Sequence, residues 1–152
     1  MFRNWLNENK IDNFDFFTPV FPKGSDREYW NSLNHDPYIK EAENYLGFDW
    51  PIIKAADYIT YRTTGNRTQQ ETPHFARRSA LLSLMLGEIC EYKGRFIPDI
   101  VDGLFLICEE TFWGVSAHYP NHISDMLPDA ENCYIDLFVG ETASTVALTY
   151  YL

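Results

Sequence analysis

The sequence predicts an all-α fold for this chain of 152 residues, and three observations support the prediction. Apolar residues recur at helical spacing along most of the chain, and prolines and glycines stand at the predicted helix starts and ends. The connection around Gly94 is only a few residues long, which forces the helices on either side into an antiparallel hairpin. The length and the hydrophobic fraction of 45% indicate one folded domain over residues 1–152.

The N-terminal part is predicted to be a lead-in followed by short helices. Residues 1–24 end in a stretch with two prolines and a glycine, which favours an irregular path. Two short amphipathic helices are then expected, one from Ser25 and one from Asp36 to just before Gly47. A third helix is predicted over 51–65, because a proline opens this stretch and a glycine closes it.

The clearest start signal is Thr72-Pro73, a capping residue followed by a proline that suits the first helical position. The helix it opens is predicted to run to about Lys93, and its apolar residues lie nearly all round, so it is expected to be buried on several sides. A further helix is predicted over 97–110. Residues 111–134 are interpreted as an irregular loop, and a loop of this length in a compact domain is more often functional than accidental.

The final helix is predicted over about 134–152, and its last turn holds no glycine, proline or basic residue. We interpret this as a chain cut within or just after an inner helix; the alternative is that the chain ends where order ends. The first interpretation predicts an unmet apolar face and a homodimer through this helix. That face would consist of Ile135, Phe138, Val139, Thr142, Val146 and Thr149, widened by Ala143, Ala147 and Tyr150.

The charge excludes some classes of partner. A net charge of -10 disfavours nonspecific binding to nucleic acid or to an anionic membrane, because the long-range field repels phosphate. An anionic ligand would need a local basic pocket. The basic residues that lie close together are expected to form a solvated helix face, with a ligand-binding role as the alternative: Lys54, Arg62, Arg67, Arg77 and Arg78.

The cysteines and the N-terminus bear on the compartment. Cys90 and Cys108 lie in apolar helical runs and are expected to be small buried hydrophobes, and with Cys133 they form neither a disulfide framework nor zinc spacing. Residues 1–17 mix charges with aromatics and lack the apolar core of a signal peptide, and no run reaches transmembrane length. We therefore expect a cytoplasmic protein, or a periplasmic or secreted one if an upstream segment was removed.

The second half of the chain carries a series of short motifs: Gly87–Phe96 (GEICEYKGRF), Ile107–Gly114 (ICEETFWG), Ala117–Pro120, Leu127–Asp129, Tyr134–Phe138 and Glu141–Ala143. Together the series resembles the heparinase II/III-like polysaccharide lyases, strongly over 87–152 and weakly over the preceding helices. The resemblance implies helical hairpins that form part of an incomplete (α/α) toroid, with a substrate cleft at one end.

The resemblance also implies a chemistry. Members of this family cleave uronate-containing polysaccharides by β-elimination, in which a base removes the proton at C5, a polar group neutralises the carboxylate and an acid protonates the leaving oxygen. The family's catalytic motifs lie beyond the equivalent of Leu152, so the chain is expected to be inactive alone and no catalytic residue is assigned. The implied partner is an acidic polysaccharide or oligosaccharide, without a cofactor.

The predicted substrate-binding residues are Glu109, Glu110, Trp113, His118 and Tyr119. They form the densest set of carboxylate, imidazole and aromatic groups in the chain, and aromatic rings stack on sugars while His and Glu bond sugar hydroxyls. The alternative is structural: the glutamates cap the helix end and the rings plug the core.

Two other patterns receive plainer interpretations. His118 and His122 have the i, i+4 spacing of metal ligands, but Pro120 between them disfavours a helix, so no metal is predicted. Glu88 and Glu91 are expected to be a solvated helix edge rather than a hydrolase pair. The alternative to a lyase segment is a stand-alone helical carbohydrate-binding or protein-interaction module, and a glycoside hydrolase or epimerase is a weaker third possibility.

Overall fold

The structure is a computed structural model that describes residues 21–119, 126–129 and 134–152. Within these ranges the chain forms six α-helices, one 3₁₀ turn and no strand, which confirms the all-α prediction. The elements are α2 (Arg27–Asn31), α3 (Asp36–Glu43), α4 (Ala55–Thr64), α5 (Thr68–Glu91), α6 (Ile97–Cys108), η1 (Ser116–His118) and α7 (Leu137–Tyr151). None of the described helices is long and apolar enough to cross a membrane.

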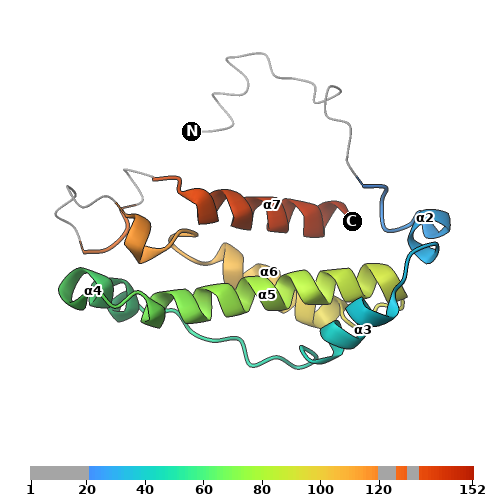
Figure 1. The fold of residues 1–152 in the computed structure, drawn as a ribbon, viewed down its shortest axis with the longest axis horizontal. Helices are drawn as coiled ribbons and strands as arrows, with labels where there is room; N and C mark the ends of the chain where they lie inside the picture. Colours follow the sequence, from blue (N-terminus) through green and yellow to red (C-terminus); the bar gives the residue numbers. More distant parts are fainter. Residues whose placement is uncertain (1–20, 120–125, 130–133) are drawn as a thin grey trace, which may run out of the picture.

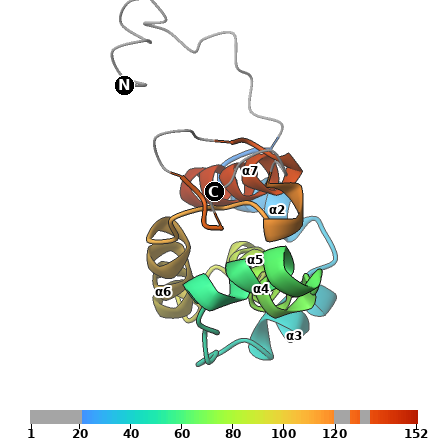
Figure 2. The same cartoon turned by 90° about the vertical axis from the view of Figure 1, so that its left-hand side faces the viewer.

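Helix α5 is the centre of the molecule (Figure 1). Helices α3 and α6 make most of its helix contacts, and α7 runs alongside it in the same direction. Viewed from one end, α7 and α3 lie on opposite sides of α5, with α6 beside it (Figure 2). Helix α6 returns antiparallel to α5, so the predicted hairpin is confirmed.

The hairpin turn is organised by Glu88. Tyr92 and Gly94 adopt left-handed backbone angles, with φ of 54° and 79°. The Glu88 carboxylate accepts hydrogen bonds from the backbone N–H groups of Gly94 at 2.6 Å and Phe96 at 3.2 Å. The prediction that Glu88 lies on a solvated edge was therefore wrong, because a tight turn leaves buried N–H groups that need an acceptor.

Two apolar clusters form the core. The larger joins α3, α5 and α6 and consists of Ala42, Leu81, Leu84, Phe96, Ile100 and Ile107. The smaller joins α2 and α5 through Trp30, Met85 and Ile89. Helices α3 and α5 cross so closely that a Cβ atom at Gly87 would lie 2.2 Å from the Cβ of Ala42.

Several predicted boundaries differ from the structure. Helix α5 begins at Thr68, so Pro73 lies inside it and not at its first position. The earlier start is stabilised by the Asn66 side chain, which accepts from the Thr68 N–H, and by the Gln70 side chain, which accepts from the Ser116 N–H. By contrast, helices α4 and α7 begin a few residues later than expected, after residues with extended backbone.

The apolar stripe of α7 is partly used within the chain. Thr142 is buried, Val146 packs against the larger core cluster, and Leu148 and Leu152 pack against the smaller one. The prediction of an unmet face is therefore wrong for Thr142 and Val146, because α7 covers α5 and the segment that follows α6. Ile135, Ala143, Ala147 and Tyr150 are exposed, so part of the stripe is uncovered, and the homodimer through this helix stays a prediction.

The cysteines of the described residues differ in exposure. Cys90 is buried as expected, whereas Cys108 is exposed at the last position of α6. The expectation of burial was wrong for Cys108, because it shares the exposed side of α6 with Val101 and Phe105. Cys133 lies outside the described residues.

Candidate functional site

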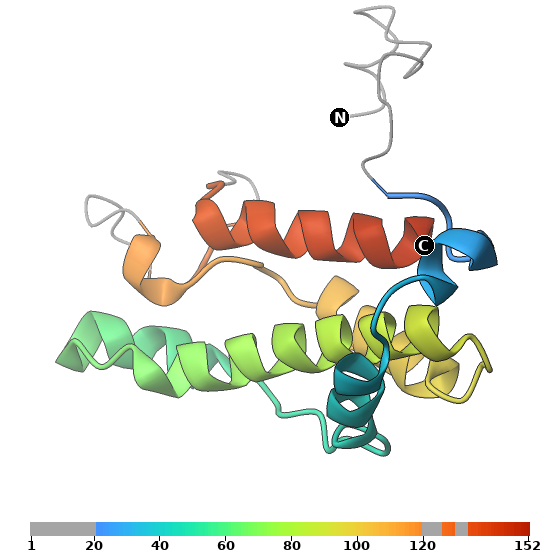
Figure 3. The same ribbon diagram turned by 45° about the vertical axis from the view of Figure 1, so that its right-hand side comes forward.

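The segment after α6 passes between α5 and α7 (Figures 1 and 3). Its middle is buried, and the Gln70 side chain on α5 holds it there. The backbone N–H of Ser116 donates to Gln70 Oε1 at 3.0 Å, and Gln70 Nε2 donates to the carbonyl oxygen of Gly114 at 3.4 Å. The loop is thus fixed to the helix by an amide that satisfies a donor and an acceptor of the buried backbone.

Glu110, just after α6, forms a buried ion cluster with two arginines of α5. It accepts from Arg77 Nη1 at 2.9 Å, and from Arg78 Nη1 at 2.9 Å and Nη2 at 2.6 Å. The side chains of Arg77, Arg78 and Glu110 are only 8%, 10% and 5% exposed. The prediction that these arginines lie on a solvated face was wrong, because their counter-charge comes from a distant part of the sequence.

The arginines also tie four segments together. Arg77 Nε donates to the carbonyl oxygen of Pro51 at 2.7 Å, and its Nη1 donates to that of Leu106 at 3.3 Å. Arg78 Nε donates to Thr142 Oγ1 on α7 at 3.1 Å. The cluster therefore joins four segments: α5, the end of α6, α7 and the connection between α3 and α4.

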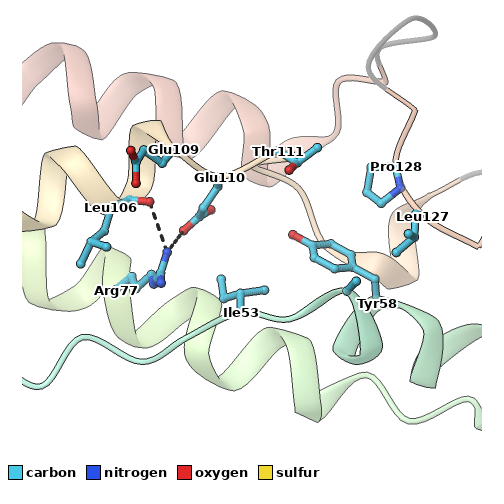
Figure 4. A pocket seen from close by; sticks show the side chains of 10 residues that line it. Ile53, Tyr58, Arg77, Leu106, Glu109, Glu110, Thr111, Leu127 and Pro128 are labelled. Atoms are coloured by element: carbon cyan, nitrogen blue, oxygen red, sulfur yellow. Dashed lines mark hydrogen bonds and ion pairs between the residues drawn. The ribbon is translucent and has the colours of Figure 1, made fainter.

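Two adjoining cavities open at this end of α6. The first has a volume of about 340 Å³ and is lined by Ile53, Ala55, Tyr58, Arg77, Leu106, Glu109, Glu110, Thr111, Leu127 and Pro128 (Figure 4). The second has a volume of about 400 Å³ and is lined by Cys108, Glu110, Thr111, Phe112, Trp113, Tyr119, Pro128, Asp129, Tyr134, Ile135 and Val139. They share Glu110, Thr111 and Pro128, and we refer to the pair as the α6-end groove.

Four of the five predicted site residues line the α6-end groove. Glu109 is exposed in the first cavity, Glu110 lines both, and Trp113 and Tyr119 line the second. Besides Glu110 in its ion cluster, two of them also have structural roles: Trp113 Nε1 donates to the carbonyl oxygen of Ile107 at 2.7 Å, and Tyr119 Oη accepts from a loop N–H at 3.0 Å. The rings therefore brace the groove wall that they line.

His118 lies apart from the residues that line these two cavities. Its Nδ1 is 3.0 Å from Asp136 Oδ2, and its ring stacks on Phe138 with a centroid distance of 5.3 Å. His122, with which it was considered as a metal ligand, lies outside the described residues. Across the described part of the chain, no three His, Cys, Asp or Glu side chains come together in a way that could hold a metal ion.

No family model matches the chain, and a search of curated proteins finds no matching sequence. The function proposed below therefore depends on the groove and on the motifs in the sequence.

Tyr58 is a groove residue that the sequence did not single out. Its hydroxyl donates to the carbonyl oxygen of Phe112 at 3.2 Å, and burial, helped by the charge of Glu110, raises its pKa to about 12. The hydroxyl stays protonated at neutral pH, so it serves as a donor and not as a base. Tyr134, which borders the second cavity, was also missed. Tyr58 belongs to no motif, and Tyr134 opens the motif Tyr134–Phe138 but lies far from Tyr58 in sequence, so folding brings the two to the groove.

Proposed function

We propose that this chain supplies one wall of a groove that binds acidic oligosaccharides, as the N-terminal part of the helical toroid of a heparinase II/III-like polysaccharide lyase. The observation that carries the proposal is the α6-end groove, whose second cavity holds most of its aromatic rings and whose first cavity holds Arg77 and Glu109. The motifs that resemble the lyase family include the residues from Glu109 to Tyr119 that form much of its wall.

The lining of the groove suits a saccharide. Sugar rings present apolar C–H faces and a rim of hydroxyls, so they are bound by aromatic side chains together with a few directed polar groups. The second cavity offers Phe112, Trp113 and Tyr134 as rings. The first offers Glu109 and Thr111, whose side chains can bond hydroxyls.

The direction of the helices supports the toroid part of the proposal. Helices α5 and α7 run in the same direction and α6 runs opposite to both (Figures 1 and 3). In a toroid of helical hairpins the helices of one layer run in a common direction and those of the other layer run back. Helices α5 and α7 would then belong to one layer and α6 to the other.

The proposed contribution is binding and scaffold. We assign no catalytic residue to this chain, and the proposal places the base and acid of β-elimination in other segments of the protein. Tyr58, which is held protonated by burial, would bond substrate only as part of the wall.

The test is a titration of the ¹⁵N-labelled chain with a uronate-containing tetrasaccharide, followed by the indole Nε1–H resonance of Trp113. We expect Tyr134→Ala to weaken binding about fivefold, the loss expected for one stacking ring worth about 1 kcal/mol. The matched control is Tyr150→Ala, because Tyr150 is an exposed tyrosine away from both cavities. The proposal fails if the tetrasaccharide leaves the Trp113 resonance unmoved, or if both variants bind as the parent does.

A protein-interaction module is the second candidate, and one observation favours it. Ile97, Val101 and Phe105 are exposed at four-residue spacing and so form an apolar stripe along α6. If this stripe is an interface between copies, sedimentation will show association that Phe105→Ser abolishes. A chain that remains monomeric at high concentration would count against that candidate and leave the groove proposal unaffected.

A further inference from the structure

The ion cluster beside the α6-end groove carries unequal charge. Two guanidinium groups, those of Arg77 and Arg78, share the single carboxylate of Glu110, so two positive groups and one negative group leave one positive charge in excess. Charges removed from water are costly unless they are paired. Of the other carboxylates near this region, that of Asp136 is engaged by His118 and by two backbone N–H groups, and that of Glu109 is exposed. An anion placed next to the cluster would offset the excess charge.

The two arginines differ in what their nitrogens do. Arg78 uses all three side-chain nitrogens, in bonds to Glu110, to Thr142 and to the carbonyl oxygen of His74. Arg77 uses Nε and Nη1, while its Nη2 has no hydrogen-bonding partner within the residues that the structure describes. Arg77 also lines the first cavity (Figure 4). Because the guanidinium is planar and is held by three bonds, Nη2 is fixed in place before any ligand arrives.

We propose that the first cavity of the α6-end groove is a subsite for a carboxylate group, which Arg77 binds through Nη2. This inference rests on the proposed function, since it assigns the acidic group of the saccharide to one end of the groove and the ring to the aromatic end. The hydroxyl of Thr111, in the wall that both cavities share, is a second donor within the subsite.

The charges in the wall favour a carboxylate over a phosphate. Glu109 and Glu110 both line the first cavity, so an approaching anion meets two carboxylates as well as Arg77. One excess positive charge offsets a single negative charge, whereas a phosphate monoester carries close to two at neutral pH.

The experiment compares methyl glucuronide with methyl glucoside on the ¹⁵N-labelled chain at constant ionic strength, and follows the Nε–Hε resonance of Arg77 and the indole resonance of Trp113. We expect the glucuronide to move both resonances and the glucoside to move only that of Trp113. Arg77→Lys keeps the charge but loses the planar guanidinium and its fixed Nη2. It should weaken glucuronide binding about tenfold while glucoside binding is unchanged.

A second variant keeps the test decisive if Arg77→Lys does not fold. Glu109 is exposed, and removing its charge lowers the repulsion that an anion meets in the cavity. Glu109→Gln keeps an oxygen and gains a donor for sugar hydroxyls but loses the charge, so it should raise the ratio of glucuronide affinity to glucoside affinity about two- to fivefold, an effect of the size expected for one partly screened charge. An equal ratio in the parent and in Glu109→Gln would overturn the inference.

The two resonances separate the two proposals. Movement of Trp113 without Arg77 under glucuronide overturns the carboxylate subsite and leaves the saccharide groove standing. Movement of Arg77 alone supports the subsite and overturns the saccharide groove. No movement of either resonance overturns both. Tighter binding of methyl glucoside 6-phosphate or 6-sulfate than of the glucuronide overturns the assignment to a carboxylate.

Discussion

The Nδ1 atom of His118 lies 3.0 Å from Oδ2 of Asp136, and this contact is one of three that Asp136 makes. Oδ2 also accepts from the backbone N–H of Val115 at 3.2 Å, and Oδ1 accepts from that of Val139 at 2.8 Å. One nearly buried carboxylate thus caps α7, holds the segment beneath it and orients the histidine ring. The place of α7 over the groove wall depends on this residue.

Replacing Asp136 is expected to destabilise the protein more than replacing an ordinary helix cap. Asp136→Ala removes the cap of α7 and leaves the buried N–H of Val115 without an acceptor, which together should cost about 2–4 kcal/mol in the free energy of unfolding. Asp26 caps α2 in an exposed position through one bond to the N–H of Tyr29, so Asp26→Ala should cost about 1 kcal/mol or less. Urea unfolding of the two variants tests the difference, and equal losses would show that Asp136 acts only as a cap.

Glu110 is expected to be among the most sensitive positions in the chain. Glu110→Gln leaves two buried guanidinium groups without a counter-charge, and breaking a buried pair in this way costs about 3–5 kcal/mol. The comparison is Glu43, which pairs with Arg95 at 2.7 Å with both side chains at least one-third exposed. Glu43→Gln should cost at most about 1 kcal/mol. If chemical unfolding gives similar values for the two variants, water reaches the Glu110 cluster.

Two glycines should respond oppositely to alanine. A Cβ at Gly87 would lie 2.2 Å from the Cβ of Ala42, and neither helix can yield without losing core contacts, so Gly87→Ala should destabilise by about 1–3 kcal/mol. A Cβ at Gly140 in α7 meets no described atom within 4 Å, and Gly140→Ala should stabilise by about 0.5–1 kcal/mol. Thermal unfolding measures both. A stabilised Gly87→Ala variant would mean that α3 does not cross α5 as closely as described.

The sequence predicted helix boundaries well where a proline or glycine at the boundary itself determines them. The α5–α6 hairpin follows from Gly94, and the start of α3 follows from Asp36-Pro37. The start of α5 was misplaced, because Asn66 and Gln70 stabilise a longer helix through contacts that a local reading of Pro73 cannot include.

Contacts between residues distant in sequence also limited what the sequence could predict about the α6-end groove. The run from Glu109 to Tyr119 is contiguous, so its concentration of polar and aromatic groups was visible in the sequence. The burial of Arg77 and Arg78 was not, because their partner Glu110 comes more than thirty residues later. Tyr58 joins the groove from a third segment. A charge pattern predicts a solvated face only when no distant residue supplies the counter-charge.

Lowering the pH should destabilise the protein in part because protonating the buried imidazole of His74 is unfavourable in the folded state. This histidine is buried, and burial, together with the charge of Arg78, lowers its pKa to about 3 from an ordinary value of 6.5. Asp136 acts in the opposite direction and Arg77 in the same direction as Arg78, but burial dominates. In the unfolded chain the imidazole takes up a proton as pH falls through about 6.5, whereas in the folded chain it stays neutral.

The sign of the pH dependence follows from that difference. Below about pH 6.5 the unfolded state binds one more proton than the folded state at this position, so the contribution of His74 to stability is lost as pH falls toward about 3. The slope it adds is at most about 1.4 kcal/mol per pH unit. His74→Leu removes the titrating group, so urea unfolding between pH 7 and pH 4 should give a shallower loss of stability for the variant than for the parent. Carboxylates elsewhere titrate in both proteins and cancel in the difference. Parallel stability curves would mean that the imidazole gains its proton in the folded protein as readily as in the unfolded chain, and that His74 is less enclosed by α7 than its burial indicates.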